Sequence, residues 1–141
     1  MHKSTWILGM VLAASCARAE TFTVDLIGVR FEYQGMVNRD IVLVINPGDT
    51  VQWNWVSGFH NVVSGQPDDP DIGALFDSGS PTTEPGINFA YTFTTPGIYW
   101  YLCEPHIHHD MVSSIVVTPA PAGGAILAIG GLLAFRRRRS P

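Results

Sequence analysis

The prediction of the fold starts from residues 88–103, NFAYTFTTPGIYWYLC. Large apolar side chains occupy every second position on both sides of Thr95-Pro96-Gly97, and Pro-Gly is a turn signal. Because successive side chains of a strand point to opposite faces, the run predicts two strands joined by a tight turn. The alternating apolar residues are Phe89, Tyr91 and Phe93 in the first strand, and Tyr99, Tyr101 and Cys103 in the second.

Four further segments carry the same strand signature: residues 21–31, 41–45, 50–56 and 111–118. Asn46-Pro47-Gly48-Asp49 separates two of them as a turn. Residues 64–86 are polar and rich in Pro and Gly, and we expect an excursion between strands that could include one helical turn. Short strands at regular intervals predict an all-β fold, an antiparallel Greek-key sandwich.

Charge is distributed unevenly along the chain. All twelve acidic residues lie between Glu20 and Asp110, whereas residues 20–118 contain only two basic residues, Arg30 and Arg39. This segment therefore has a formal charge of −10, which argues against nucleic-acid binding, since that needs a basic surface. Its many aromatic and β-branched residues argue against intrinsic disorder.

Residues 1–19 have the features of a secretory signal peptide. His2 and Lys3 precede an uncharged stretch, and Ala17-Arg18-Ala19 offers a small-x-small cleavage site before Glu20. A membrane-spanning helix and a lipoprotein signal ending at Cys16 are the alternatives; the apolar stretch is short for the first. We predict export.

Residues 119–141 combine Pro119-Ala120-Pro121, an uncharged apolar stretch over 125–135 and four arginines. A helix over 122–135 would rise only ~21 Å, short of a ~30 Å hydrocarbon core. The layout resembles the PEP-CTERM sorting tails of exported bacterial proteins, although the usual Pro-Glu-Pro is absent. Either a sorting protease removes the tail or it remains as a weak membrane anchor. Both alternatives place residues 20–118 outside the cytoplasm, in the periplasm or at the cell surface.

Once the leader is removed, Cys103 is the only cysteine, so it cannot form a disulfide within the chain. Cys103, His106 and Met111 follow the spacing Cys-x2-His-x4-Met, and His60 lies upstream, after the Trp-rich segment. Two imidazoles, a thiolate and a weak axial thioether form the donor set of blue-copper sites. The pattern therefore predicts a copper site.

Residues 21–118 resemble the plastocyanin/pseudoazurin branch of the cupredoxins. The resemblance rests on residues 46–51, on His60-Asn61-Val62-Val63, on residues 93–103 and on the loop from Cys103 to Met111. It implies one type 1 copper ion with a roughly trigonal set of His60, Cys103 and His106 and a long axial bond to Met111. It also implies that Asn61 ties the His60 segment to the ligand loop, and that the edge of His106 reaches the surface through an apolar patch.

Each proposed ligand also has an ordinary structural interpretation. His60 is typical of a structural histidine, Cys103 of a small buried apolar residue, and Met111 of a core filler. His108 has the cysteine spacing of the azurin loop, but His106 fits the distance to the methionine better; we expect His108 and His109 to face solvent. The acidic run Asp68, Asp69 and Asp71 shows no calcium-loop pattern and predicts a solvated loop.

The resemblance implies a carrier of single electrons and not an enzyme, because a single domain with Leu102 and Glu104 beside the cysteine offers no second copper centre. We expect a monomer whose acidic surface attracts a positively charged redox partner, such as a c-type cytochrome or a membrane oxidase. Copper storage or delivery is the main alternative, and a structural surface protein is a third. Two departures from the family are noted: Leu102, where plant-type plastocyanins have tyrosine, and Ser113, where the family often has glycine.

Overall fold

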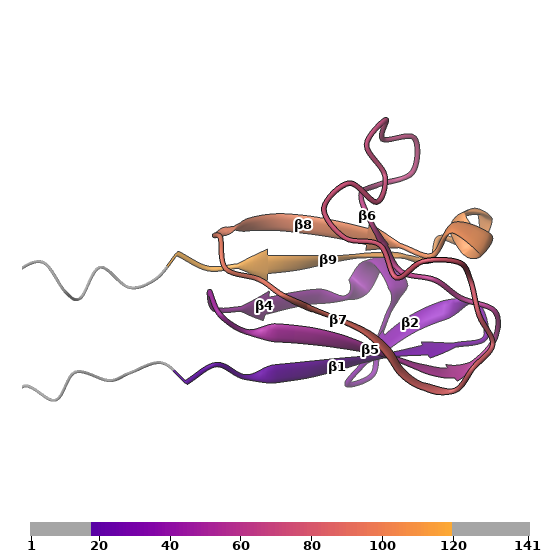
Figure 1. The fold of residues 1–141 in the computed structure, drawn as a ribbon, viewed down its shortest axis with the longest axis horizontal. Helices are drawn as coiled ribbons and strands as arrows, with labels where there is room; N and C mark the ends of the chain where they lie inside the picture. Colours follow the sequence, from indigo (N-terminus) through magenta and orange to yellow (C-terminus); the bar gives the residue numbers. More distant parts are fainter. Residues whose placement is uncertain (1–17, 120–141) are drawn as a thin grey trace, which may run out of the picture.

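Two β-sheets pack face to face in the computed structural model, which describes residues 18–119 (Figure 1). The first sheet has the strand order β3-β2-β1-β5-β7 and the second has the order β4-β9-β8-β6. The first comprises β1 (Thr21–Ile27), β2 (Arg30–Tyr33), β3 (Met36–Val37), β5 (Thr50–Ser57) and β7 (Gly86–Thr92). The second comprises β4 (Val42–Ile45), β6 (Val63–Ser64), β8 (Gly97–Leu102) and β9 (Val112–Val117). Two short 3-10 helices, η1 (Asn38–Asp40) and η2 (Glu104–His109), complete the described elements.

The prediction of a β-sandwich is confirmed, but its sheets are mixed and not purely antiparallel. β1 pairs with β5 in parallel, and β4 pairs with β9 in parallel, whereas β8 runs antiparallel to β9 and β5 antiparallel to β7. Alternation of apolar residues tells which face of a strand is buried, but it carries no information about the direction of the neighbouring strand. Strands distant in sequence became neighbours here, so local patterns did not reveal their direction.

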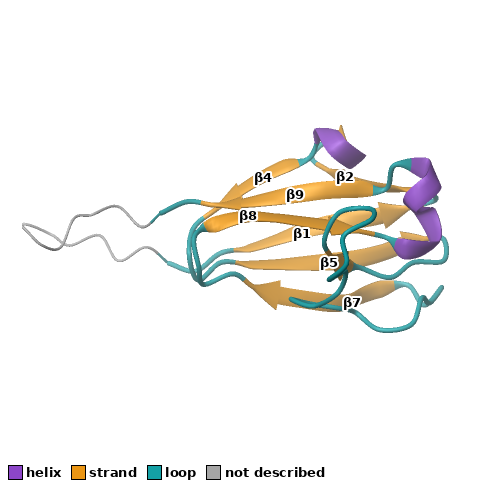
Figure 2. Ribbon diagram, turned by 90° about the horizontal axis from the view of Figure 1, so that it is seen from above, coloured by secondary structure: helices purple, strands orange, loops and turns teal. Residues whose placement is uncertain are grey.

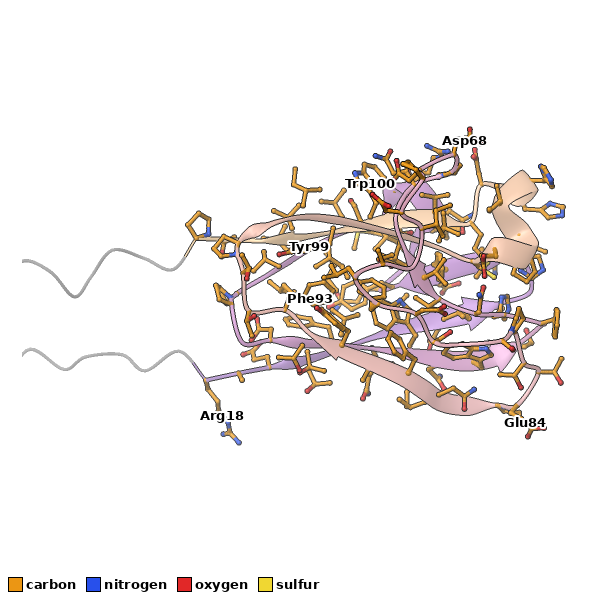
Figure 3. The ribbon with its side chains drawn as sticks, turned by 45° about the horizontal axis from the view of Figure 1, so that its top comes forward. Arg18, Asp68, Glu84, Phe93, Tyr99 and Trp100 are labelled. Carbon is orange, nitrogen blue, oxygen red and sulfur yellow. The ribbon has the colours of Figure 1, made fainter. Side chains whose placement is uncertain are left out.

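Alternate side chains of the strands fill the space between the sheets. Trp53 of β5 and Tyr101 of β8 are both fully buried, and their ring centroids lie 5.3 Å apart in an edge-on arrangement. The ring centroids of Phe31, in β2, and Tyr101 lie 4.8 Å apart. Nearer the chain ends, Phe93 and Tyr99 lie between the two layers (Figure 3), 5.1 Å apart. Aromatic contacts therefore fix one sheet against the other.

Two predicted segments differ from the structure in their boundaries. The strand predicted over residues 21–31 is broken at Gly28, where φ is +62°, and reverses into β2. Residues 65–85 form turns and isolated bridges with no helix; Phe76, only 5% exposed, anchors this segment to the core. The excursion is thus an ordered loop between β6 and β7.

The turn at residues 46–49 is fixed by a buried carboxylate. Asp49, 1% exposed, accepts hydrogen bonds from the backbone N–H of Asn46 at 2.7 Å and of Glu20 at 2.8 Å. Gly48 adopts a φ of +99°, which favours glycine. The turn therefore ties the start of the sandwich to β4 and β5.

The two described chain ends leave the sandwich at one end, and η2 lies at the opposite end (Figures 1 and 2). Within residues 18–119, no helix has both the length and the apolar character to cross a membrane. The predicted signal peptide, apart from its last two residues, and nearly all of the predicted sorting tail lie outside the described residues.

Candidate metal centre

One loop positions three of the four predicted ligands. β8 ends before Cys103, and η2 begins at Glu104 with Pro105 in its first turn, where a missing N–H costs nothing. Asp110 ends η2 in the left-handed conformation, with a φ of 58°, and reverses the chain toward β9. The backbone N–H of Cys103 donates to the carbonyl of Met111 at 3.1 Å and closes the loop.

His60 comes from the connection after β5. Its backbone forms a bridge with Thr82, with hydrogen bonds of 3.0 and 2.8 Å in the two directions. The indole N–H of Trp55 donates to the His60 carbonyl at 3.0 Å. The His60 side chain is fully buried, so the fold holds this histidine inside the sandwich end and not at the surface.

The side chains of His60, Cys103 and His106 converge. The Cys103 Sγ lies 3.5 Å from the His60 Nδ1 and 3.4 Å from the His106 Nδ1, and the three ligand atoms all lie within 4.8 Å of one another. Metal bonds of about 2.0 Å to nitrogen and about 2.3 Å to sulfur, at about 110–120°, would separate nitrogen and sulfur by about 3.5–3.7 Å. The donor atoms are therefore spaced as the ligands of one metal ion.

A hydrogen bond fixes the orientation and tautomer of the His60 ring. Its Nε2 lies 2.9 Å from the carbonyl oxygen of Ser57, which can only accept, so Nε2 carries the proton and Nδ1 presents a lone pair to the sulfur side. Burial lowers the pKa of His60, although the Ser57 carbonyl opposes this shift. His60 is consequently neutral at pH 7, the form that binds metals.

Burial raises the pKa of the Cys103 thiol to about 11, with a smaller contribution in the same direction from the charge of Glu104. Backbone hydrogen bonds from Asn61 and His106 act in the opposite direction, because they stabilise the thiolate. Without a cation the sulfur is thus protonated at neutral pH. A bound metal would take the place of that proton.

His106 differs from His60 in its exposure. Its ring centroid lies 4.9 Å from that of His60, but the residue is only partly buried. Burial lowers the pKa of His106, and the neighbouring His60 and His109 lower it further. Among the converging donors, His106 is therefore the one that reaches the protein surface.

Met111 is fully buried, and its backbone N–H donates to the His106 carbonyl at 3.3 Å. Its backbone thus belongs to the same closed loop as the other donors, while its role as axial ligand stays a prediction. His108 and His109 are exposed, as expected, and the ring of His109 lies 6.1 Å from that of His106. Neither belongs to the converging group of His60, Cys103 and His106.

Asn61 ties the two ligand segments together, as the resemblance implied. Its side-chain oxygen accepts from the backbone N–H of Glu104 at 3.0 Å, and its Nδ2 donates to the Glu104 carboxylate at 2.5 Å. No role for Glu104, Gly58 or the Ser57 carbonyl was predicted from the sequence. Their only sequence signals were position: Glu104 follows Cys103, and Ser57 and Gly58 shortly precede His60. Because every residue has a backbone carbonyl, the sequence does not indicate which one accepts a hydrogen bond.

The two departures from the family have structural explanations. Leu102 is fully buried in a small cluster with Val63 and Val112. Ser113 is also fully buried, and its hydroxyl donates to the carbonyl of Asn38, which links β9 to η1. Leu102 therefore packs against neighbouring strands of the second sheet, and Ser113 joins that sheet to η1.

A two-sheet sandwich whose end holds a buried His-Cys-His donor group defines the cupredoxin class of metalloproteins. Residues 27–118 match the family of copper binding proteins of the plastocyanin/azurin type. The chain belongs to this family, and its cofactor is copper in a type 1 site. Proteins of the plastocyanin type are electron carriers and not enzymes.

Curated relatives agree with this assignment. A halocyanin from Natronomonas pharaonis is 35% identical over 75 residues, covering 52% of this chain and 43% of the relative. A chloroplastic plastocyanin from Tetradesmus obliquus is 34% identical over 86 residues, covering 58% of this chain and 59% of the relative. The chain thus spans about half the length of these relatives.

Solved structures show the same fold. A purple cupredoxin from Nitrosopumilus maritimus has a TM-score of 0.53 at 23% identity, covering 69% of this chain and 99% of that protein. The oxidised plastocyanin from Dryopteris crassirhizoma has a TM-score of 0.50 at 22% identity, covering 68% and 99%. At this identity the likeness concerns the fold.

Gly58 leaves the space that the His60 ring occupies. A Cβ at this position would overlap the His60 Nε2 and lie 2.7 Å from the Gly28 carbonyl oxygen. We expect Gly58→Ala to displace the ring and to weaken copper binding by roughly 10- to 100-fold, the usual cost of disturbing a ligand's support. Copper titration of the metal-free protein measures the effect. Gly79→Ala is the control, because Gly79 also has a positive φ, +87°, but an added Cβ there would meet no atom within 4 Å. Equal losses in both variants would contradict the explanation.

Copper uptake should release protons. The thiol pKa of about 11 leaves Cys103 protonated at pH 7, whereas both histidines are neutral there. Binding at pH 7 should therefore release about one proton, and apparent affinity should rise about tenfold per pH unit until the pH approaches the thiol pKa. A pH-indicator dye in weak buffer measures the release. Uptake without proton release would exclude the Cys103 sulfur as a ligand.

Proposed function

We propose that this protein is an extracytoplasmic electron carrier that shuttles single electrons between redox partners through one type 1 copper ion. In this proposal His60, Cys103 and His106 are the equatorial ligands, and Met111 is the axial ligand. The carrying observation is the convergence of two imidazole Nδ1 atoms on one buried sulfur at 3.5 and 3.4 Å. A copper ion in such a site supplies a one-electron couple.

The surrounding residues support electron transfer because they hold the donors in place. The Ser57 carbonyl orients His60, and the Asn61–Glu104 pair joins the two ligand segments. The hydrogen bond from Cys103 to Met111 closes the ligand loop. Since fast transfer needs little rearrangement between the two oxidation states, a donor set fixed from both sheets suits a carrier.

His106 offers the route for the electron, because it is the partly exposed member of the donor group. The formal charge of −10 on residues 20–118 favours a positively charged partner, such as a c-type cytochrome or a membrane oxidase. We propose that the protein acts as a monomer and that its association with the partner slows as the salt concentration rises.

The domain organisation belongs to the same proposal. Residues 1–19 act as an export signal, residues 20–118 form the copper domain, and residues 119–141 act as a sorting tail or membrane attachment. The sequence features of the two ends support this organisation. A protein of this arrangement works in the periplasm or at the cell surface.

The proposed function can be tested by measuring whether a visible absorption band forms with copper and responds reversibly to reduction and oxidation. One equivalent of Cu(II) added to the purified metal-free protein should produce an intense visible band from thiolate-to-copper charge transfer. Ascorbate should bleach the band and ferricyanide should restore it. Cys103→Ser removes the thiolate and should abolish the band, whereas Ser114→Ala, a similarly small change at a buried residue of β9, should keep it. Survival of the band in Cys103→Ser would disprove the site.

The axial role of Met111 has a separate test. Met111→Leu should keep the colour and raise the reduction potential, because a weak donor that favours the oxidised ion is lost. Potentiometric titration of both proteins measures the difference. A bleached variant or an unchanged potential would contradict the axial assignment.

Copper storage or delivery is the second candidate, and the exposed His108 and His109 beside the ligand loop favour it. A Cu(I) delivery protein stays colourless with ferricyanide and transfers its metal to a chelator. A carrier cycles between coloured and bleached forms and keeps its metal. The redox cycle therefore separates the two functions.

A further inference from the structure

A carboxylate is held beside the ligand sulfur. Glu104 directly follows Cys103, and its Oε2 accepts a hydrogen bond from the Asn61 Nδ2 at 2.5 Å. The Glu104 backbone N–H returns a hydrogen bond to the Asn61 Oδ1 at 3.0 Å. Asn61 itself is 1% exposed, so its side chain cannot swing away. The orientation of the Glu104 side chain is therefore restrained by hydrogen bonding, although the residue lies at the surface.

The carboxylate lies in the chain next to the proposed ligands, because Glu104 directly follows Cys103 and its hydrogen-bond partner Asn61 directly follows His60. In residues 18–119 the ion pairs join Arg30 to Glu32 and Arg39 to Asp110, and none involves Glu104. No basic side chain in the described part of the chain neutralises this charge.

We propose that Glu104 sets the reduction potential of the metal centre: its negative charge, held by Asn61 next to Cys103, favours the oxidised state. The inference rests on the proposed function. One-electron reduction removes one positive charge from the centre, while the ligands stay the same. A nearby negative charge stabilises the more positive, oxidised form and so lowers the potential.

The expected size follows from the exposure of the carboxylate. Solvent screens a surface charge, so its effect is much smaller than that of a buried one. Removing the Glu104 charge should raise the ratio of reduced to oxidised protein at a fixed electrode potential by about threefold to tenfold. This corresponds to about 30–60 mV, at 59 mV per tenfold for a one-electron couple.

Glu104→Gln is the decisive variant. Glutamine keeps the length of the side chain and an amide oxygen that accepts from Asn61, but it removes the charge. We expect its potential to rise by the stated amount in low salt and by less in high salt. The visible band should keep its position, because the ligands are unchanged.

Two matched variants separate charge from shape. Glu104→Asp keeps the charge but shortens the side chain, and its potential should stay near that of the parent protein. Asp68→Asn changes net charge by the same amount in the exposed loop between β6 and β7, on the outer side of the second sheet (Figure 3). Asparagine tolerates the φ of 70° at this position, and we expect no shift.

The outcomes are distinguishable. A Glu104→Gln potential equal to that of Asp68→Asn would overturn the inference, and so would an equal shift in Glu104→Asp, since geometry would then be the cause. Thermal unfolding of the metal-free variants adds an independent readout: Glu104→Ala, which loses the contact with Asn61, should unfold at a lower temperature than Glu104→Gln. If the parent protein develops no charge-transfer band, the proposed function fails, whereas a coloured protein with an unshifted Glu104→Gln variant refutes only the role of Glu104.

Discussion

The contact between Trp53 and Tyr101 determines how the two sheets meet. These fully buried rings come from strands of opposite sheets and lie 5.3 Å apart, so neither strand can slide without opening the core. Cys103 lies two residues beyond Tyr101, and the His60 connection begins where the strand of Trp53 ends. The packing of the core therefore fixes the meeting point of a sulfur and an imidazole that are 43 residues apart in the chain.

Around that meeting point, backbone hydrogen bonds restrain both segments that carry the donors. The Ser57 carbonyl holds His60, the Thr82 bridge holds its backbone, and the loop from Cys103 to Met111 is closed by its own hydrogen bonds. These restraints come from chain elements that also build the sandwich. A displaced strand would therefore displace a proposed ligand, which would couple metal binding to folding.

The electrostatics of the centre combine two opposing effects. Burial disfavours charge on both the histidines and the cysteine, which keeps the imidazoles neutral and the metal-free sulfur protonated. Backbone N–H groups from Asn61 and His106 favour the thiolate, and the carboxylate of Glu104 opposes it. In the metal-free protein, burial and the polar groups around the sulfur together determine its protonation state.

The strand faces and the sandwich could be predicted from the sequence alone, and so could a set of candidate donor residues. Alternating apolar residues and the spacing of Cys103, His106 and Met111 are local features, and local features can be recognised directly in the sequence. Only the folded chain reveals that β1 pairs in parallel with β5. It alone also shows the 3.5 Å approach of His60 to Cys103 and the hydrogen bond from Asn61 to Glu104. These features depend on which distant segments pack together, and side-chain packing of the core settles that choice through contacts that no single stretch of sequence contains.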